Sequence, residues 1–267
     1  MPISFQTAGA VAAGTTSAAV PHPTGIVAGD LLLLFCSYKY SDIFATPAGW
    51  TKMGAGGIGI CGAGPGVDTG AAGIIVFFKI AVGGETGNLT VTNTSGNVLL
   101  CRMFRYSYDT ATKDMALIIG NGEDSAAGSN QWFTALTGWR SANGSVPLTG
   151  ADVSVAANDV VVAASGINAD TYTYTSQVFS MAGITTGTVV ERQDSGTASG
   201  QDCALVITEH PITAGANSND SFSYTMTSSS FTANNPCGGT VVVRMREVDK
   251  VSSNSLDPFG MMGFFGL

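Results

Sequence analysis

Apolar and polar residues alternate with a period of two along several segments of the chain. Phe222, Tyr224 and Met226 fall on one face of such a segment, and hydroxyl side chains fall on the other. Residues 88–92 and 171–175 alternate in the same way. This period is typical of β-strands that have one face on a core and the other in solvent. Because helical periodicity is nearly absent, the pattern predicts an all-β protein.

A second kind of segment is apolar on both faces. Such runs span residues 30–35, 73–78, 159–163 and 240–243. Strands of this kind are expected in the middle of a sheet that a second sheet covers. Glycine-rich joints such as residues 54–57 separate the runs as turns. We therefore predict a two-sheet antiparallel β-sandwich that is jelly-roll-like, with extended terminal arms.

The chain also contains one sequence pattern twice. Residues 27–34 and 155–162 both contain small residues, a glycine or asparagine, an aspartate and then an apolar run. The glycine or asparagine suits a turn with positive φ, and the aspartate, Asp30 or Asp159, can accept hydrogen bonds from the N–H groups of that turn. Each copy therefore predicts a tight turn that leads into a buried strand.

The repeated pattern continues downstream, where residues 99–104 resemble residues 241–246. A period of roughly 130 to 140 residues is too long for a solenoid. We interpret residues 26–248 as one sandwich with two related halves, at about 26–108 and 155–248. Each half would expose a bare apolar sheet face if it stood alone.

Two segments are expected to lie outside the sandwich. Residues 1–25 are interpreted as an N-terminal arm or first strand, and residues 249–267 as a polar spacer followed by an apolar docking tail. The tail residues expected to dock onto a partner are Phe259, Met261, Met262, Phe264, Phe265 and Leu267. Left in water, this tail would be a costly apolar exposure, so we expect it to insert into a neighbouring subunit, with packing into its own core as the alternative.

The composition narrows the classes of partner. Hydrophobic residues make up 45% of the 267 residues and charged residues only 11%, and the net charge is −8. Without a basic cluster the chain is not expected to bind nucleic acid. No apolar stretch is long enough to insert into a membrane. The start of the chain lacks the features of a secretory signal, so synthesis in a cytoplasm is expected, with the cysteines reduced.

Motifs for catalysis and for cofactors are missing. The two histidines, His22 and His210, each stand beside a proline and are expected to be surface or packing residues. The chain has no Gly-x-Ser-x-Gly elbow, no zinc-ligand spacing and no phosphate loop. Residues 121–124 could offer oxygen ligands to calcium, but no EF-hand pattern follows. We expect no cofactor, no metal and no enzymatic activity.

Aromatic residues offer one further candidate site. Possible glycan-binding residues are Trp132, Trp139, Tyr172 and Tyr174. Aromatic rings of this kind can stack on sugars. In sandwiches they more often belong to the core or to an interface.

Residues 26–108 carry a pattern that resembles a known family. It comprises an Ala-Gly-Asp turn into an apolar strand, the segment Thr46-Pro-Ala-Gly-Trp-Thr51, a strand that ends in Lys79, a Gly-Gly-Glu turn, a Thr-Val-Thr strand and a strand through Tyr106. With a closing strand at residues 239–246, about 220 residues are similar to β-sandwich proteins on the virions of tailed bacteriophages. These are often labelled tail-fibre, appendage or head-surface proteins.

The resemblance implies a fold and a location, and it carries over no catalytic residues. In this pattern Pro47, Gly49 and Trp50 form a tight turn with a large buried aromatic side chain. The Phe/Met/Gly tail is a departure from the family. We expect a structural protein in the virion, made in the host cytoplasm, that forms a homo-oligomer or lattice with other virion proteins as head decoration or tail-fibre appendage. The alternative is a receptor-binding adhesin for host attachment through a surface glycan.

Overall fold

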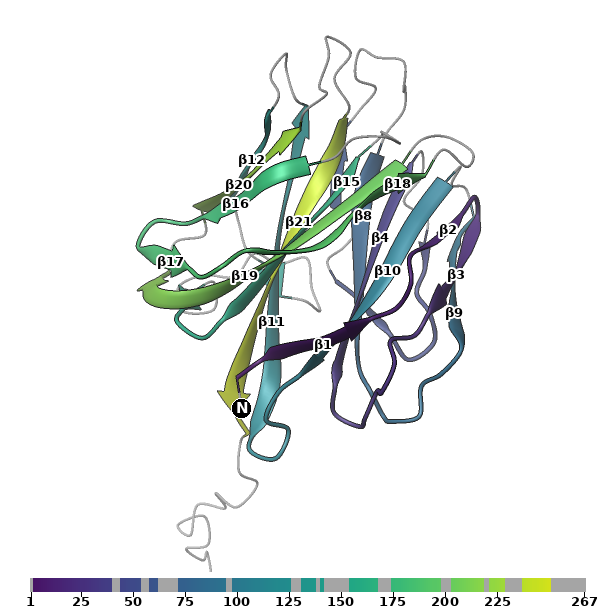
Figure 1. Cartoon of the computed structure of the whole chain (residues 1–267), viewed down its shortest axis with the longest axis horizontal. Helices are drawn as coiled ribbons and strands as arrows, with labels where there is room; N and C mark the ends of the chain where they lie inside the picture. Colours follow the sequence, from purple (N-terminus) through teal and green to yellow (C-terminus); the bar gives the residue numbers. More distant parts are fainter. Residues whose placement is uncertain are drawn as a thin grey trace, which may run out of the picture.

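The structure is a computed structural model of the chain. It describes residues 2–39, 44–53, 58–61, 72–94, 98–125, 131–137, 140–141, 154–167, 174–197, 203–218, 221–228 and 237–250. All regular elements in these ranges are β-strands, and they pair antiparallel in two large and two small sheets (Figure 1). The predicted all-β sandwich is confirmed.

The first large sheet comes from the N-terminal half of the chain. Its strand order is β1 (Ser4–Ala8), β10 (Val98–Ser107), β4 (Leu31–Lys39), β8 (Ala72–Ile80) and β6 (Thr51–Lys52). Two short strands extend it, β2 (Ala12–Gly14) against β10 and β7 (Ile58–Cys61) against β8. The central strand β4 is buried along its whole length, as its apolar run predicts.

The second large sheet comes from the C-terminal half. Its strand order is β13 (Arg140–Ser141), β11 (Lys113–Ser125), β21 (Cys237–Asp249), β15 (Val160–Ile167), β19 (Cys203–Asn217) and β14 (Val155–Ala156). Two further strands pair with β19, namely β17 (Ile184–Thr186) and β18 (Val190–Thr197). Here β15 is the strand that is buried throughout.

Each large sheet carries a three-stranded sheet on its outer face. In the N-terminal half this outer sheet has the order β3 (Ser17–Pro21), β9 (Asn88–Asn93) and β5 (Phe44–Ala45). In the C-terminal half it has the order β12 (Gln131–Thr137), β20 (Ser221–Ser228) and β16 (Tyr174–Ser180). The sandwich therefore has four layers, two more than the sequence suggested, because the large sheets are apolar on both faces.

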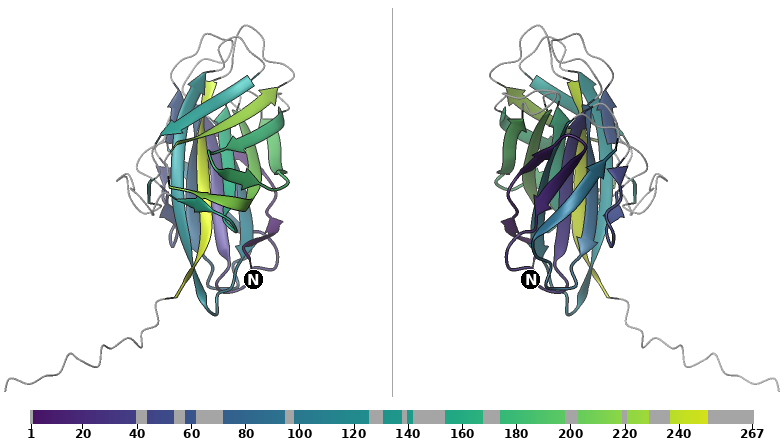
Figure 2. Two further views of the ribbon diagram at one scale, coloured as in Figure 1. Left: turned by 90° about the vertical axis from the view of Figure 1, so that its left-hand side faces the viewer. Right: turned by 90° about the vertical axis from the view of Figure 1, so that its right-hand side faces the viewer.

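Alternation along the strands distributes side chains among three cores. Leu31, Leu33 and Phe35 of β4 point into the central core, where they meet Val162 and Val243 of the second large sheet. The alternate residues of β4 point the other way, into a second core under β3 and β9. The third core lies between the second large sheet and its outer sheet. Figure 2 shows the stacked ribbons from two sides.

The two halves have the same topology. The order β1-β10-β4-β8-β6 in the first large sheet matches β11-β21-β15-β19-β18 in the second, and β3-β9-β5 matches β12-β20-β16 in the outer sheets. The matched strands also follow one another in the same order along the chain. The two halves are therefore structural repeats, and they are joined through one central core.

The repeated turn is the local signature of this duplication. Asp30 N–H donates to Val27 O at 3.2 Å, and Asp159 N–H donates to Ala156 O at 3.1 Å. One carboxylate oxygen of each aspartate accepts the N–H three residues earlier, at 2.8 Å in both halves. Gly29 and Asn158 precede the aspartates, with φ of 92° and 75°. The turns predicted from the sequence are confirmed.

The alignment of residues 99–104 with residues 241–246 in the repeated pattern needs a correction. In the sheets, Leu32 is opposite Arg105 and Val161 is opposite Arg244, so Arg105 and Arg244 occupy equivalent positions. The sequence comparison instead aligned Arg102 with Arg244, three residues out of register. It matched an Arg-Met dipeptide that occurs in both strands, whereas strand pairing sets the true equivalence.

For the N-terminal segment, the interpretation as a first strand is correct, and its expected place outside the sandwich is wrong. Residues 4–21 form β1, β2 and β3, which pair with β10 and β9. This segment therefore lies within the sandwich and not outside it. Trp50, by contrast, lies where it was expected. Its N–H closes the turn on Pro47 O at 3.0 Å, and its side chain is buried in the second core with 7% exposed.

Candidate functional site

The predicted docking tail and two of the predicted glycan-binding residues lie outside the described residues. These are Phe259, Met261, Met262, Phe264, Phe265 and Leu267 in the tail, together with Trp139 and Tyr172. The backbone at Trp132 and Tyr174 is described. Trp132 on β12 is opposite Met226 of β20, and Tyr174 on β16 is opposite Ser228 of the same strand. The outer sheet thus places Trp132 and Tyr174 on either side of β20, opposite residues of that strand that are two positions apart.

One end of the molecule gathers the repeated turns and both ends of the described chain. We call this the turn end, defined by residues 27–30, 108–112 and 156–159. Figures 1 and 2 show the start of β1 and the end of β21 there. Asp109 N–H donates to the Glu247 carboxylate at 2.8 Å, and Lys250 N–H donates to Thr112 O at 3.0 Å. These bonds tie the last turn of the first half to the last strand of the second.

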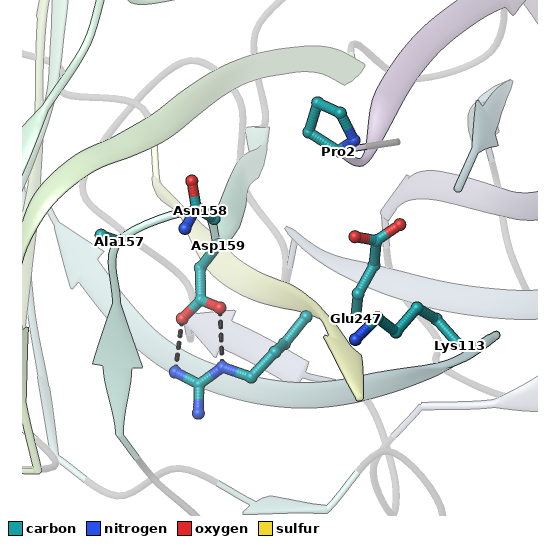
Figure 3. Close-up of a pocket in the computed structure, with 7 residues that line it drawn as sticks. Pro2, Lys113, Ala157, Asn158, Asp159 and Glu247 are labelled. Carbon is teal, nitrogen blue, oxygen red and sulfur yellow. Dashed lines mark hydrogen bonds and ion pairs between the residues drawn. The ribbon is translucent and has the colours of Figure 1, made fainter. Parts of the chain in front are cut away.

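A polar cavity of about 450 Å³ opens at the turn end (Figure 3). It is lined by Pro2, Lys113, Ala157, Asn158, Asp159, Arg246 and Glu247. The dashed lines at Asp159 mark two bonds from the guanidinium of Arg246, at 2.7 and 2.6 Å. Two cations and two carboxylates line the cavity, so it offers no net charge to a ligand.

The other half has a similar clamp, but its arginine stands at a different position of the strand, because Arg105 is equivalent to Arg244 and not to Arg246. Arg105 Nε donates to Asp30 at 2.6 Å, and one of its amino groups donates to Thr24 O at 3.2 Å. Arg246 makes the corresponding bond to Ser154 O at 3.0 Å. Both aspartates are almost fully buried. The arginines therefore hold the turns closed, and this role accounts for their place at the turn end.

A second cavity, of about 410 Å³, lies beside the turn of the first half. It is lined by His22, Pro23, Thr24, Gly25, Ile26, Gly84, Glu85, Thr86 and Gly87. Burial opposes ionisation of Glu85, but the N–H of Val82 and the ammonium of Lys79 outweigh it and lower the pKa of Glu85 to about 2. This loop is thus fixed by an ion pair that persists across the physiological pH range.

Exposed apolar side chains lie close in the chain to the residues that line this second cavity. Val82 is 76% exposed, Val27 is 56% exposed and Ile80 is 41% exposed. The two turns that carry Val27 and Val82 touch, because a Cβ added to Gly83 would lie 3.2 Å from Ala28 N. We call Val27, Ile80 and Val82 the apolar patch. Sequence reasoning missed it, although its signal is present as apolar residues beside a glycine pair.

A buried ion pair in the second half also contacts the first half. Arg192 on β18 pairs in a bidentate manner with Glu209 on β19, at 3.1 and 2.9 Å. Tyr106 of the first large sheet donates its hydroxyl to Glu209 at 3.0 Å. The guanidinium of Arg192 also lies 3.8 Å from the centre of the Phe5 ring. Burial, reinforced by the charge of Glu209, raises the pKa of Tyr106 and keeps its hydroxyl a donor.

His210 is a packing residue in the third core. Its Nε2 lies 2.8 Å from Thr208 Oγ1, which in turn lies 2.9 Å from the hydroxyl of Tyr224. The ring also packs against Phe179. Burial lowers the pKa of His210 to about 4, because the imidazolium would lose its hydration there. His210 is therefore neutral at pH 7 and serves packing.

We expect this histidine to make stability depend on pH. Folded His210 titrates near 4 and the unfolded residue near 6.5, so the unfolded state binds more protons between these values. The free energy of unfolding should therefore fall by about 3 kcal/mol as the pH drops from about 6.5 to about 4. Urea unfolding at several pH values measures this loss. The contribution should disappear in His210→Leu and remain in His22→Gln, and equal pH slopes in all three proteins would contradict the assignment.

The described ranges contain neither a metal-binding cluster nor a membrane-spanning helix. No group of three or more His, Cys, Asp or Glu side chains there is arranged to hold a metal ion. Within the same part of the chain, no helix is long and apolar enough to cross a bilayer. Cys36, Cys101 and Cys203 are buried as thiols. No family model matches the chain, and neither a curated protein sequence nor a solved structure matches it.

Proposed function

We propose that the protein is a non-enzymatic structural subunit of a bacteriophage virion. In this role it is exposed on the particle surface, as head decoration or as a tail or fibre appendage, and it docks to neighbouring subunits through its termini. The observation that carries the proposal is the fusion of two repeated halves through one continuous core, with each turn clamped by a buried ion pair. A rigid block of this kind suits a subunit that must keep its shape within a particle.

The strand order within each half supports the proposal. In the first half, β1-β10-β4-β8 form one sheet and β3-β9-β5 the sheet that packs on it. A jelly roll would have a similar order, but with β6 beside β5, whereas here β6 joins β8. Jelly rolls occur in viral capsid proteins and in lectins. Since a fold does not fix a function, the proposal also depends on the sequence resemblance to virion proteins.

Purification of the particle tests this function. Particles from cells that produce the chain are separated from free protein on a density gradient, and their proteins are quantified by mass spectrometry. We expect the chain to band with intact particles in a fixed ratio to the major head or tail protein. A chain that stays entirely in the soluble fraction would contradict the proposal.

The tail prediction has its own variant in the same assay. Removal of residues 257–267 should leave a folded sandwich that no longer bands with particles, because the apolar anchors are lost. The matched control replaces these residues with a Gly/Ser sequence of equal length, which keeps the chain length and also removes the anchors. Normal incorporation of both variants would show that the tail does not dock the subunit.

The adhesin remains a second candidate because of the outer sheet. Trp132 and Tyr174 are on either side of β20, opposite residues Met226 and Ser228 of that strand. Aromatic residues so placed suit a glycan-binding surface. Binding to a glycan array, lost in Trp132→Ala, would favour this function, and an array without signal would argue for a purely structural subunit.

A further inference from the structure

The apolar patch is not a requirement of the fold. Pairing of Leu31 with Ile80 in the first half corresponds to pairing of Val160 with Pro211 in the second. By the same register, Val82 corresponds to Thr213 and Val27 to Ala156. The second half therefore builds the same turn with proline, threonine and alanine. The three exposed apolar side chains of the first half serve something other than the turn itself.

The patch lies close to the point where the described chain ends. Lys250 is bonded to the turn at residues 110–112, through its N–H to Thr112 O and its ammonium to Thr110 O at 2.6 Å. Thr110 in turn packs on Gly29, where an added Cβ would lie 2.7 Å from its methyl group. Gly29 belongs to the turn that carries Val27. A continuous surface thus connects the end of β21 to the patch.

The sequence that follows Lys250 has the composition to cover such a patch. Residues 251–258 contain serines, an asparagine and one acidic residue, and residues 259–267 contain three phenylalanines, two methionines and a leucine. Eight extended residues span about 25 Å. This reach lets residues 259–267 extend beyond the surface of their own copy. It fits the patch of a second copy whose turn end faces this one.

We propose that the apolar patch and the cavity beside it receive residues 257–267 of a second copy of this chain. The phenylalanine side chains would occupy the cavity between residues 22–26 and 84–87, and the patch would flank them. Since the described chain ends at Lys250, at the same end of the molecule as the receiving surface, two copies related by a twofold axis can each give and receive a tail. This inference rests on the docking role proposed for the tail and names the surface that receives it.

Photo-crosslinking in the full chain tests the contact. A p-benzoylphenylalanine replaces Phe264, and ¹⁵N-labelled and unlabelled chains are mixed at low concentration before they are concentrated and irradiated. We expect crosslinks from position 264 to residues 22–28 or 80–87 that join a labelled to an unlabelled chain. Crosslinks within one copy only, crosslinks to other surfaces, or no crosslinks would each overturn the proposal.

Surface variants give an independent measurement in solution. Val27→Asp and Val82→Asp in the full chain should weaken self-association at least tenfold in sedimentation velocity, because a carboxylate would be buried against the tail. Val178→Asp is the matched control, since Val178 is an exposed valine of the outer sheet away from the turn end, and it should associate like the wild type. Equal association of all three variants, or a monomeric wild type, would overturn the inference.

The two proposals fail in different ways. A chain that bands with particles but shows no crosslinks to the patch would keep its virion role and dock elsewhere. A chain that crosslinks between copies but never bands with particles would keep the patch contact and lose the virion role.

Discussion

Replacing Gly166 with valine should prevent folding or lower the free energy of unfolding by more than about 4 kcal/mol. Gly166 lies on β15, at a position where the two large sheets approach each other closely. A Cβ at this position would lie 2.2 Å from Gly73 O and 2.7 Å from Ser37 Oγ, both on the opposite large sheet. Because backbone atoms block the space, no side-chain rotation relieves the clash, and the central core must open.

Chemical unfolding followed by fluorescence measures this effect, and Gly166→Ala gives the graded case at about 3 kcal/mol. Gly187→Ala is the matched control. An added Cβ there meets the methyl group of Thr213 at 3.0 Å, and side-chain rotation can make room for it. If the variants at positions 166 and 187 lost equal stability, the close approach of the two sheets would be wrong.

Asp159→Ala should cost about 3–5 kcal/mol of stability, and Asp30→Ala should cost a similar amount. Each aspartate is almost fully buried, accepts the N–H that closes its turn and pairs with an arginine. Removing it leaves a partly buried guanidinium without its partner and an orphaned N–H in the turn. Thermal and urea unfolding of the two variants measure the loss in each half.

Asp249→Ala provides the control for this pair. Asp249 is bonded to Lys113, but its side chain is 87% exposed, so the loss of this ion pair should leave stability unchanged within error. A double variant, Asp159→Ala with Arg246→Met, should recover part of the loss because no unpaired guanidinium remains. If Asp159→Ala behaved like Asp249→Ala, the buried clamp would have no role in stability.

The sequence predicted those parts of the fold in which the burial of each face determines the spacing of apolar residues. Strands that are apolar on both faces, such as β4 and β15, are central strands with both faces covered. Phe222 and Tyr224 alternate with hydroxyls and are buried, as their spacing indicates. The repeated turn was also readable, because Gly29 and Asn158 precede an aspartate that the turn itself requires.

Other features left no local signal. The strand β1 is an edge strand with polar and half-buried residues, so its pattern resembled an arm. The pair of Arg192 and Glu209, with Tyr106 from the other half, joins residues that only the tertiary fold brings together. The apolar patch depends on two turns that touch, and neither turn alone marks it as a site.

The position of β21 in the second large sheet has a consequence for synthesis on the ribosome. This strand lies between β11 and β15 and pairs with both along most of their length. Asp249 of β21 pairs with Lys113 of β11, and these two residues are 136 positions apart in the chain. Until residues 237–249 emerge, β11 and β15 therefore each have an edge with unpaired backbone groups. Strands of other chains can pair with these edges. A nascent chain that stalls before this strand would be a seed for aggregation, and production of the protein should benefit from chaperones that shield open β-sheet edges.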